Sequence, residues 1–217
     1  LLDIFDKSDM PRLFERLGSH FRGSMTSLTS LFRDEQRKVM DTVLETATDE
    51  ALAVYRQFYD NHVFLLRFVH DSDNPMPKAL STAAQIVINS DLNREFGQPE
   101  LDVDTIRSLV EDARRTGIAL DDDTLEFTLR QNLERMARDL LEQPESPARL
   151  ARLTAGMELA VELPFFVEFH EIQTDHYQLK QTVYPARRES AQAGDASAGQ
   201  WVETFGRLAE ILKIRMD

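Results

Sequence analysis

The chain has 217 residues, and the 42% that are hydrophobic suffice for one large domain or two small ones with a sizeable core. Its 38 acidic residues outnumber 25 Lys and Arg, and the resulting net charge of -13 repels nucleic-acid phosphates and anionic lipid surfaces. The sequence has no cysteine, which excludes disulfides and thiolate zinc sites and fits a reducing compartment. Apolar runs are far shorter than the roughly 20 residues of a membrane-spanning helix. We therefore expect a cytoplasmic protein that binds neither nucleic acid nor membrane.

The N-terminal segment differs from a natural protein start. Residues 1–3 are Leu-Leu-Asp, without an initiator Met or the basic and apolar regions of a signal peptide. Asp9 and Pro11 favour a short helix that ends at one of the two glycines that follow. We expect residues 1–27 to be this helix and a loop, forming the tail of an absent upstream region, and residues 28–217 to form one all-α domain.

A very long helix is predicted for about residues 31–69, because one helical face persists there without a proline or glycine break. The positions on that face are Phe32, Val39, Met40, Val43, Ala47, Ala51, Val54, Phe58, His62, Leu65 and Val69. Unbroken, this helix would be roughly 57 Å long. A kink at residues 46–49, where Thr, Asp and Glu cluster, is the alternative.

Residues 71–97 raise a choice between packing and binding. Pro77 favours a helix start, and the small and large apolar residues after it let a neighbouring helix approach closely. Helical propensity drops at Asn89, Ser90 and Asp91, so we expect a bend or local cap there. Packing is the favoured interpretation, and a contact to substrate or partner through Asn89 and Asp91 is the alternative. The expected packing face consists of Leu80, Ala83, Ala84, Val87 and Ile88.

Two further helices follow in the middle of the chain. Asp102 or Asp104 can cap the first, which Gly117 should end. The acidic run at residues 121–123 lacks the spacing and glycine of an EF-hand loop, so it indicates a helix N-terminus instead. Pro144 should end the helix that this run opens. Its expected buried residues are Leu125, Leu129, Leu133, Met136 and Leu140.

The C-terminal part predicts three more helices. Ser146 and Pro147 suit the start of the first, and an aromatic-rich helix should run from Phe165 to Val183 before Pro185 ends it. A loop at residues 194–199 should precede the last helix. Expected buried residues are Leu150, Leu153, Met157 and Val161 in the first of these helices, and Trp201, Phe205, Leu208, Ile211 and Leu212 in the last. The whole pattern predicts an all-α, bundle-like fold of about eight helices.

Searches for catalytic motifs assign no catalytic, cofactor-binding or metal-binding residue. The sequence contains no G-x-G-x-x-G, P-loop, H-E-x-x-H or G-x-S-x-G motif. No Glu stands three residues before a His, as a carboxylate-bridged di-iron bundle requires. We therefore expect no cofactor.

Four candidate contact residues lie outside the segment of Asn89 and Asp91. His170 and His176 are six residues apart, so they fall on opposite faces of a straight helix and cannot share one metal. A solvated helix face is favoured over an acid-base set built around them. His62 is more simply a hydrogen-bonded histidine on an apolar face than a ligand, and Trp201 a buried helix anchor rather than a carbohydrate or protein contact. All remain candidate substrate-contacting or partner-contacting residues.

Several stretches resemble a known helical domain. They are SLFRDEQRKV at 30–39, YRQFYDNH at 55–62, PKAL at 77–80, VINSDL at 87–92, DARRTGI at 112–118, the segment 177–185, and AGDA at 193–196 with Trp201 after it. Together they resemble the C-terminal region, named domain of unknown function 3536, of bacterial proteins related to glycoside hydrolase family 57. The resemblance covers most of residues 28–214.

This resemblance implies a non-catalytic accessory domain. Enzymes similar to family 57 carry an N-terminal (β/α) barrel, in which a glutamate nucleophile and an aspartate acid/base cleave α-glucans with retention. Helices downstream commonly pack on that barrel and help wall the cleft. These 217 residues lack its alternation of strands and helices, so no catalytic residue is carried over, and the implied partners are the upstream barrel and, through it, an α-glucan. The alternative is a helical protein-interaction or structural module with no carbohydrate role.

Overall fold

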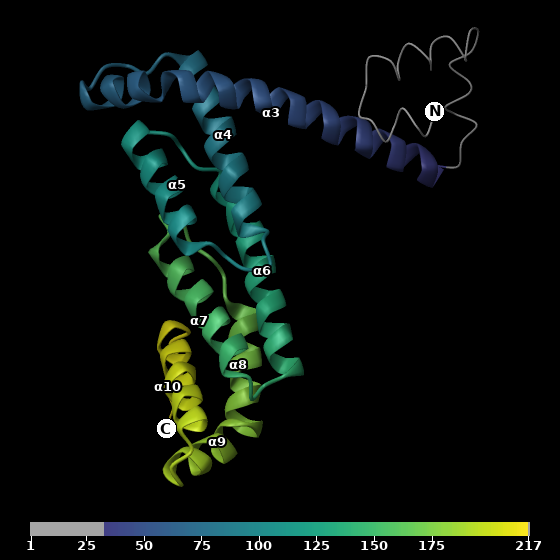
Figure 1. Ribbon diagram of the computed structural model, residues 1–217, viewed down its shortest axis with the longest axis vertical. Coiled ribbons are helices and arrows are strands. Elements are labelled where there is room, and N and C mark those ends of the chain that lie inside the picture. The colour runs from purple at the N-terminus through teal and green to yellow at the C-terminus, as the bar shows by residue number, and fades with distance from the viewer. Residues whose placement is uncertain (1–32, 217) are drawn as a thin grey trace. The chain divides into compact units, whose positions relative to one another are not determined.

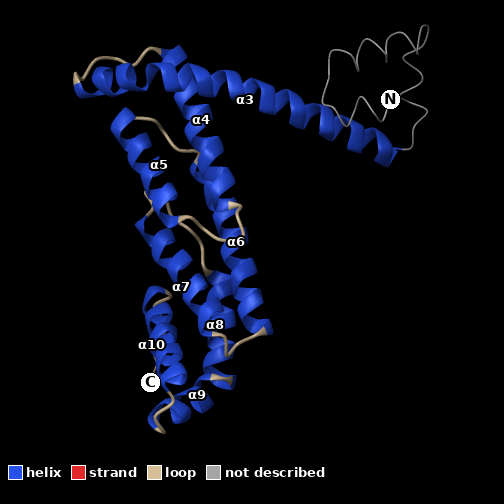
Figure 2. Cartoon of the chain, viewed as in Figure 1, coloured by secondary structure: helices blue, strands red, loops and turns tan. Residues whose placement is uncertain are grey.

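The computed structural model describes residues 33–216, apart from the side chains of residues 33–36 and Val39, and every regular element in this range is a helix (Figures 1 and 2). Eight helices in the described range confirm the all-α prediction. The expected helix after Asp9 and the domain boundary at residue 27 lie outside the described residues. The helices are α3 (Arg33–Asp71), α4 (Lys78–Phe96), α5 (Val103–Thr116), α6 (Asp122–Glu142), α7 (Pro147–Glu162), α8 (His170–Thr182), α9 (Tyr184–Gln192) and α10 (Ala196–Ile211).

The very long helix is α3, with 39 residues. Its backbone is helical without interruption, including residues 46–49, where a kink was the alternative. The chain divides into two compact units, residues 1–61 and 62–217, so the division falls within this helix. The first unit is described only through the N-terminal part of α3, and all other described helices belong to the second.

Helix α4 packs as its sequence predicts, in contact with α5 and α6 (Figure 1). All five residues of the expected packing face are buried, together with Leu92 and Phe96. No helix end lies at residues 89–91, where a bend or local cap was expected, because α4 continues through them to Phe96. The Asn89 carboxamide donates to the carbonyl of Gln85 one turn earlier, at 2.8 Å, and so adds to the backbone ladder without replacing any of its bonds.

The ends of α5 follow the expected capping rules. The Asp102 carboxylate accepts the backbone N–H of Thr105 at 3.1 Å, and Gly117 ends the helix in the left-handed conformation with φ 64°. The place of a side chain at Gly117 is occupied, because a Cβ there would lie 2.6 Å from Nδ1 of His70. The Arg67 guanidinium also meets the Asp112 carboxylate at 2.7 Å, so the last turns of α3 contact α5.

Helix α6 contacts three neighbours, α4, α7 and α8. The five residues predicted to face inward are all buried, along with Asn132 and Ala137. Helix α7 approaches α6 closely at Gly156, where a Cβ would lie 2.8 Å from Cδ2 of Leu133. Asn132 donates to the backbone carbonyls of Phe96 at 2.7 Å and Gln98 at 2.6 Å, and thereby satisfies carbonyls at the C-terminal end of α4.

The aromatic-rich helix was predicted too long at its N-terminal end. Residues 163–169 are not helical, and α8 begins only at His170. Pro164 has no N–H to donate and disfavours a helical conformation of Leu163, which is extended at φ -68° and ψ 152°. Val161 was also expected to be buried, but it is exposed near the end of α7.

The last two helices correct further boundaries. The expected end at Val183 is confirmed, because α8 ends at Thr182 with Val183 as its C-cap. Helix α9, which was not predicted, follows at once, and Pro185 lies in its first turn, where the missing N–H is tolerated. Residues 196–199 were expected in a loop but form the first turn of α10, because Asp195 caps it by accepting from the N–H groups of Ser197 and Ala198. Ile211 is half-buried, whereas the other four residues expected in the core of α10 are buried.

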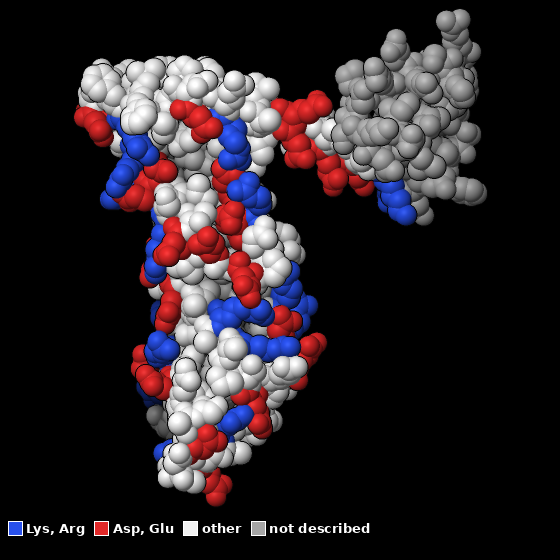
Figure 3. All heavy atoms as spheres, in the orientation of Figure 1, with Lys and Arg blue, Asp and Glu red and all other residues white. Residues whose placement is uncertain are grey.

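The surface of the second unit carries charges of both signs. Figure 3 shows acidic and basic side chains interspersed along the visible face, rather than collected by sign. Ion pairs such as Arg107 with Glu162, at 2.8 Å, link neighbouring helices. No helix within residues 33–216 is long and apolar enough to cross a membrane.

Replacing Asn132 tests the link between α4 and α6. Asn132→Leu leaves two backbone carbonyls without their donor, so we expect the free energy of unfolding to fall by about 2 kcal/mol in urea denaturation. Gln131→Leu, at the exposed neighbouring position, should change it by less than about 0.5 kcal/mol. Equal effects of the two substitutions would contradict this role of Asn132.

Candidate functional site

The six candidate residues from the sequence are spread over four helices and form no common site. His62 lies half-buried on α3, Asn89 and Asp91 on α4, His170 and His176 on α8, and Trp201 on α10. Histidines 170 and 176 face opposite ways, as predicted, since the first is exposed and the second buried. The six side chains therefore do not form one site, and the surroundings of each decide its role.

The α4 candidates serve packing. Oδ1 of Asn89 accepts the N–H of Asp121 at 2.7 Å, and its Nδ2 donates to the carbonyl of Ala119 at 3.3 Å. Asn89 thus holds the connection between α5 and α6 against α4. The carboxylate of Asp91 is buried and lies 3.2 Å from the guanidinium of Arg94 one turn later. This ion pair offsets part of the cost of burying the charge.

Trp201 and His176 belong to one aromatic stack, formed with Phe205 and Tyr184. The His176 ring lies 4.0 Å from the Phe205 ring at 9°, and the Trp201 ring lies 4.7 Å from Phe205 at 14°. Tyr184 covers Phe205 at 5.6 Å. The indole N–H of Trp201 donates to the Pro144 carbonyl at 2.9 Å, so this buried tryptophan anchors α10 beside the start of α7.

His176 is held neutral within the stack. Burial lowers the pKa of its imidazole from 6.5 to about 4, the nearby charge of Lys180 acts in the same direction, and the Phe205 carbonyl opposes both. Nε2 lies 3.4 Å from that carbonyl, whereas Nδ1 has no hydrogen-bond partner among the described residues. Burial also raises the pKa of the adjacent Asp175, with a further contribution from the Glu171 carboxylate. Both groups are shifted toward their neutral forms.

The lowered pKa makes His176 a source of acid sensitivity. Above pH 6.5 both states hold a neutral imidazole, and as pH falls toward 4 only the unfolded chain takes up the proton, so stability is lost over this range. We expect the loss to be on the order of 3 kcal/mol. His176→Phe, which keeps a stacking ring, should reduce the decline between these pH values in urea titrations. An unchanged pH profile would show that His176 does not cause the sensitivity.

A hollow lies beside the non-helical residues 163–169, which we call the strap. Its volume is about 640 Å³, and the strap, the end of α7, the start of α8 and the end of α10 enclose it. Aromatic and aliphatic side chains dominate, with a few polar groups among them, as in many ligand sites. The lining of this strap hollow comprises Ala160, Val161, Phe165, Phe166, Val167, Glu168, Phe169, His170, Gln173, Glu210, Ile211, Leu212 and Lys213.

Alternating burial along the strap orients its side chains. Phe165 and Val167 are buried, and Phe165 meets the Phe96 ring edge-on at 6.3 Å. Phe166 between them is 83% exposed, because successive residues of an extended segment point to opposite sides. The N–H of Glu168 donates to the Glu126 carboxylate at 3.3 Å, which holds the strap to α6. The strap therefore presents a large aromatic ring to solvent from a backbone fixed on its other side.

The polar groups of the strap hollow can accept or donate hydrogen bonds to a ligand. The carboxylates of Glu168 and Glu210 have no hydrogen bond or ion pair within the described part of the chain, and His170 is exposed at the first residue of α8. Gln173 is already engaged, since its Nε2 donates to the Leu212 carbonyl at 3.1 Å. Aromatic faces next to free carboxylates suit a ligand with an apolar face and hydrogen-bond donors on its rim.

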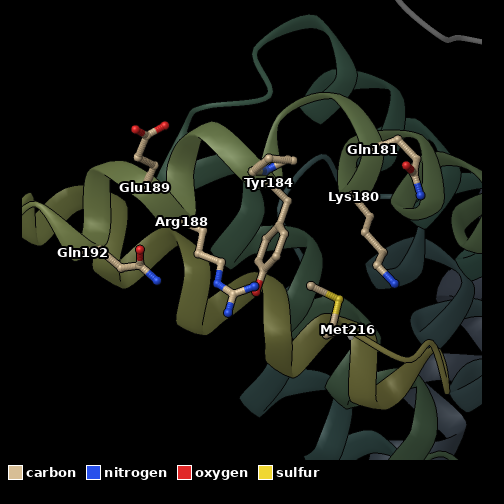
Figure 4. Close-up of a pocket in the computed structure, with 8 residues that line it drawn as sticks. Lys180, Gln181, Tyr184, Arg188, Glu189, Gln192 and Met216 are labelled. Atoms are coloured by element: carbon tan, nitrogen blue, oxygen red, sulfur yellow. The ribbon is translucent and has the colours of Figure 1, made fainter.

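A second hollow of about 440 Å³ lies between α8, α9 and the C-terminal segment (Figure 4). Lys180, Tyr184 and Arg188 project toward the space occupied by Met216, whereas Glu189 points away from them (Figure 4). Lys180 donates a hydrogen bond to the Arg215 carbonyl, so part of its capacity is used. The lining consists of Lys180, Gln181, Tyr184, Pro185, Arg188, Glu189, Gln192 and Met216.

No protein-family model matches the chain, and no curated protein or solved structure is significantly similar to it. Within residues 33–216, no group of three or more His, Asp or Glu side chains is placed to hold a metal ion.

Of the candidate contact residues that the sequence suggested, His170 alone lines the strap hollow. The other lining residues were read as a helix, so their common placement was missed. Pro164 followed by the alternation of Phe165, Phe166 and Val167 was the available signal, because an extended segment places such neighbours on opposite sides. The contribution of Glu210 and Lys213, more than 40 positions later, has no local sequence signal.

The two neighbouring phenylalanines of the strap should respond differently to truncation. Phe165→Ala removes a buried ring and should lower the free energy of unfolding by about 3 kcal/mol. Phe166→Ala removes an exposed ring and should change it by less than about 0.5 kcal/mol. Urea denaturation of both variants measures the difference, and a large loss in Phe166→Ala would mean that this ring is buried in solution.

Proposed function

We propose that this chain is a non-catalytic helical accessory domain of a protein related to glycoside hydrolase family 57. In this role it packs against an upstream catalytic barrel of the same protein and helps wall the cleft that binds an α-glucan. The sequence resemblance over residues 28–214 suggests the family context. The strap hollow is the structural observation that carries the proposal.

The chemistry of the strap hollow supports a role at a carbohydrate cleft. A sugar ring offers an apolar face, which packs on an aromatic ring, and hydroxyl groups, which donate to carboxylates. Phe166 provides an exposed ring, and Glu168 and Glu210 provide free acceptors beside it. The strap is anchored by Phe165 and by the bond from Glu168 to Glu126, so these groups are held in place before a ligand arrives.

Four of the candidate residues hold the fold together, which supports the non-catalytic assignment. Asn89 holds the α5–α6 connection, Asp91 pairs with Arg94, and Trp201 and His176 fill the aromatic stack. Each side chain therefore stabilises the fold. In the proposed protein, cleavage of the glycosidic bond is performed by the upstream barrel.

A helical protein-interaction module with no carbohydrate role is the second candidate. It is favoured by large apolar side chains that α3 exposes, including Phe64 and Phe68 in the second unit. An exposed apolar surface of this kind is typical of a protein-contact site. The two candidates differ in whether the strap hollow contacts a glucan.

The proposal is tested by measuring glucan cleavage in the protein that includes its upstream region, with and without a substitution in the strap. The protein with its upstream region should contain a barrel with an acidic catalytic pair and cleave α-glucans. Phe166→Ala in that protein should lower kcat/KM on a glucan polymer about fivefold, the equivalent of about 1 kcal/mol of lost stacking. Phe127→Ala, which removes an exposed ring of α6 outside the hollow, is the matched control and should leave kcat/KM unchanged.

Two outcomes would sink the carbohydrate assignment. An upstream region without such a barrel removes the glycosidase context altogether. A barrel whose activity is equally unaffected by Phe166→Ala and Phe127→Ala removes the strap hollow from the cleft. Either result leaves the interaction module as the better account.

A further inference from the structure

The apolar face of α3 in the first unit is exposed. Met40 is 54% exposed, Leu44 56% and Val54 67%, whereas Leu52, which points to the other side of the helix, is half-buried. One face of a 39-residue helix therefore presents large aliphatic side chains to solvent. Such a face is unfavourable in water and is typical of a surface that another helix covers.

The spacing of this face is that of a coiled coil. Its positions alternate in steps of four and three residues, which is the a and d pattern of a heptad repeat. A strict seam of this width is narrower than the apolar face of an ordinary bundle helix. The seam positions, all in the first unit, are Met40, Leu44, Ala47, Ala51, Val54, Phe58 and Asn61.

We propose that α3 pairs with α3 of a second copy of this chain in a parallel, in-register coiled coil. From Met40 to Asn61 the pattern covers about three heptads, the least extent at which a heptad pattern argues for a coiled coil. At about 1.5 Å per residue this seam is roughly 32 Å long. An identical seam on each copy is self-complementary, as a two-fold dimer contact requires.

Asn61 determines the orientation. It is the polar residue of the seam, at a d position. In a parallel, in-register pair the two Asn61 carboxamides meet and can bond each other. In an antiparallel pair, d positions face a positions, and Asn61 would meet an apolar side chain such as Leu44 or Ala51, which leaves a buried amide unsatisfied. The parallel arrangement is therefore preferred.

The flanking positions are compatible with the same arrangement. Across a parallel pair, each g residue faces the e residue of the next heptad on the other copy. The pairs formed within the first unit are Val43 with Thr48 and Glu50 with Tyr55. Neither pair places like charges together.

Self-association of the 217-residue chain tests the proposal. Each chain has a mass of 24.9 kDa, so sedimentation equilibrium should show a dimer of about twice that mass. Because each copy carries a net charge of -13, the dimer should tighten as salt rises from low ionic strength. A monomer at all concentrations up to about 100 µM would overturn the proposal, including the case in which another segment of the same chain covers this face.

A matched pair of variants locates the contact. Val54→Glu places a charge in the seam and should weaken dimerisation at least tenfold, while Ala53→Glu adds the same charge at an exposed position outside the seam and should leave it unchanged. Circular dichroism controls for helix content in both. Dimers that persist in Val54→Glu, or that are lost equally in both variants, would show that the seam is not the contact.

A single introduced cysteine reports the orientation of the two helices, because these 217 residues contain no other cysteine. Ala47→Cys should form an intermolecular disulfide on mild oxidation, since d positions of a parallel, in-register pair face each other. An antiparallel pair would keep these thiols apart. In a second variant, Asn61→Leu, the chains should still associate but no longer in one orientation only. A dimer in which Ala47→Cys fails to cross-link would overturn the parallel arrangement.

Discussion

The second compact unit depends on the buried face of α6, which meets α4, α7 and α8 at once. A side chain on that face must fit more than one neighbour, so its size and polarity are set by the whole unit. Asn132 shows the constraint most clearly, because its amide donates to two carbonyls at the end of α4 while its oxygen accepts from Arg135 at 2.6 Å. Asn132 thus fixes α4 against α6, and Gly156, which has no side chain, lets α7 approach Leu133 of α6 closely.

Buried side chains stabilise the fold, whereas exposed apolar side chains form the surfaces available for contact. The polar and aromatic residues that first suggest a site, Asn89, His176 and Trp201, are used for holding helices together. The surfaces available for contact are formed by residues that look unremarkable in sequence: a phenylalanine between two buried neighbours in the strap, and aliphatic side chains along α3. Function in this fold is therefore better sought where apolar side chains meet solvent than where polar ones are buried.

Sequence periodicity predicted the helices whose apolar residues recur every three or four positions, as in Leu125, Leu129 and Leu133 of α6. It failed at residues 163–169, because a dense apolar run has no polar face to distinguish a helix from an extended segment. Periodicity also did not predict α9, because Pro185 suits both the end of one helix, which it correctly indicated, and the first turn of the next. Long-range partners, such as the Phe96 carbonyl for Asn132, have no local sequence signal, so the strap hollow could not be assembled in advance.

Two constraints confine position 117 to glycine, one set by the local backbone and the other by a residue distant in the chain. The positive φ of Gly117 ends α5 locally, and the His70 ring from the last turn of α3 fills the place where a side chain would stand. A substitution at Gly117 therefore has to satisfy both requirements. Replacement of His70 with a small residue would free space at position 117 for asparagine, which tolerates the left-handed conformation, whereas with the imidazole in place position 117 is confined to glycine.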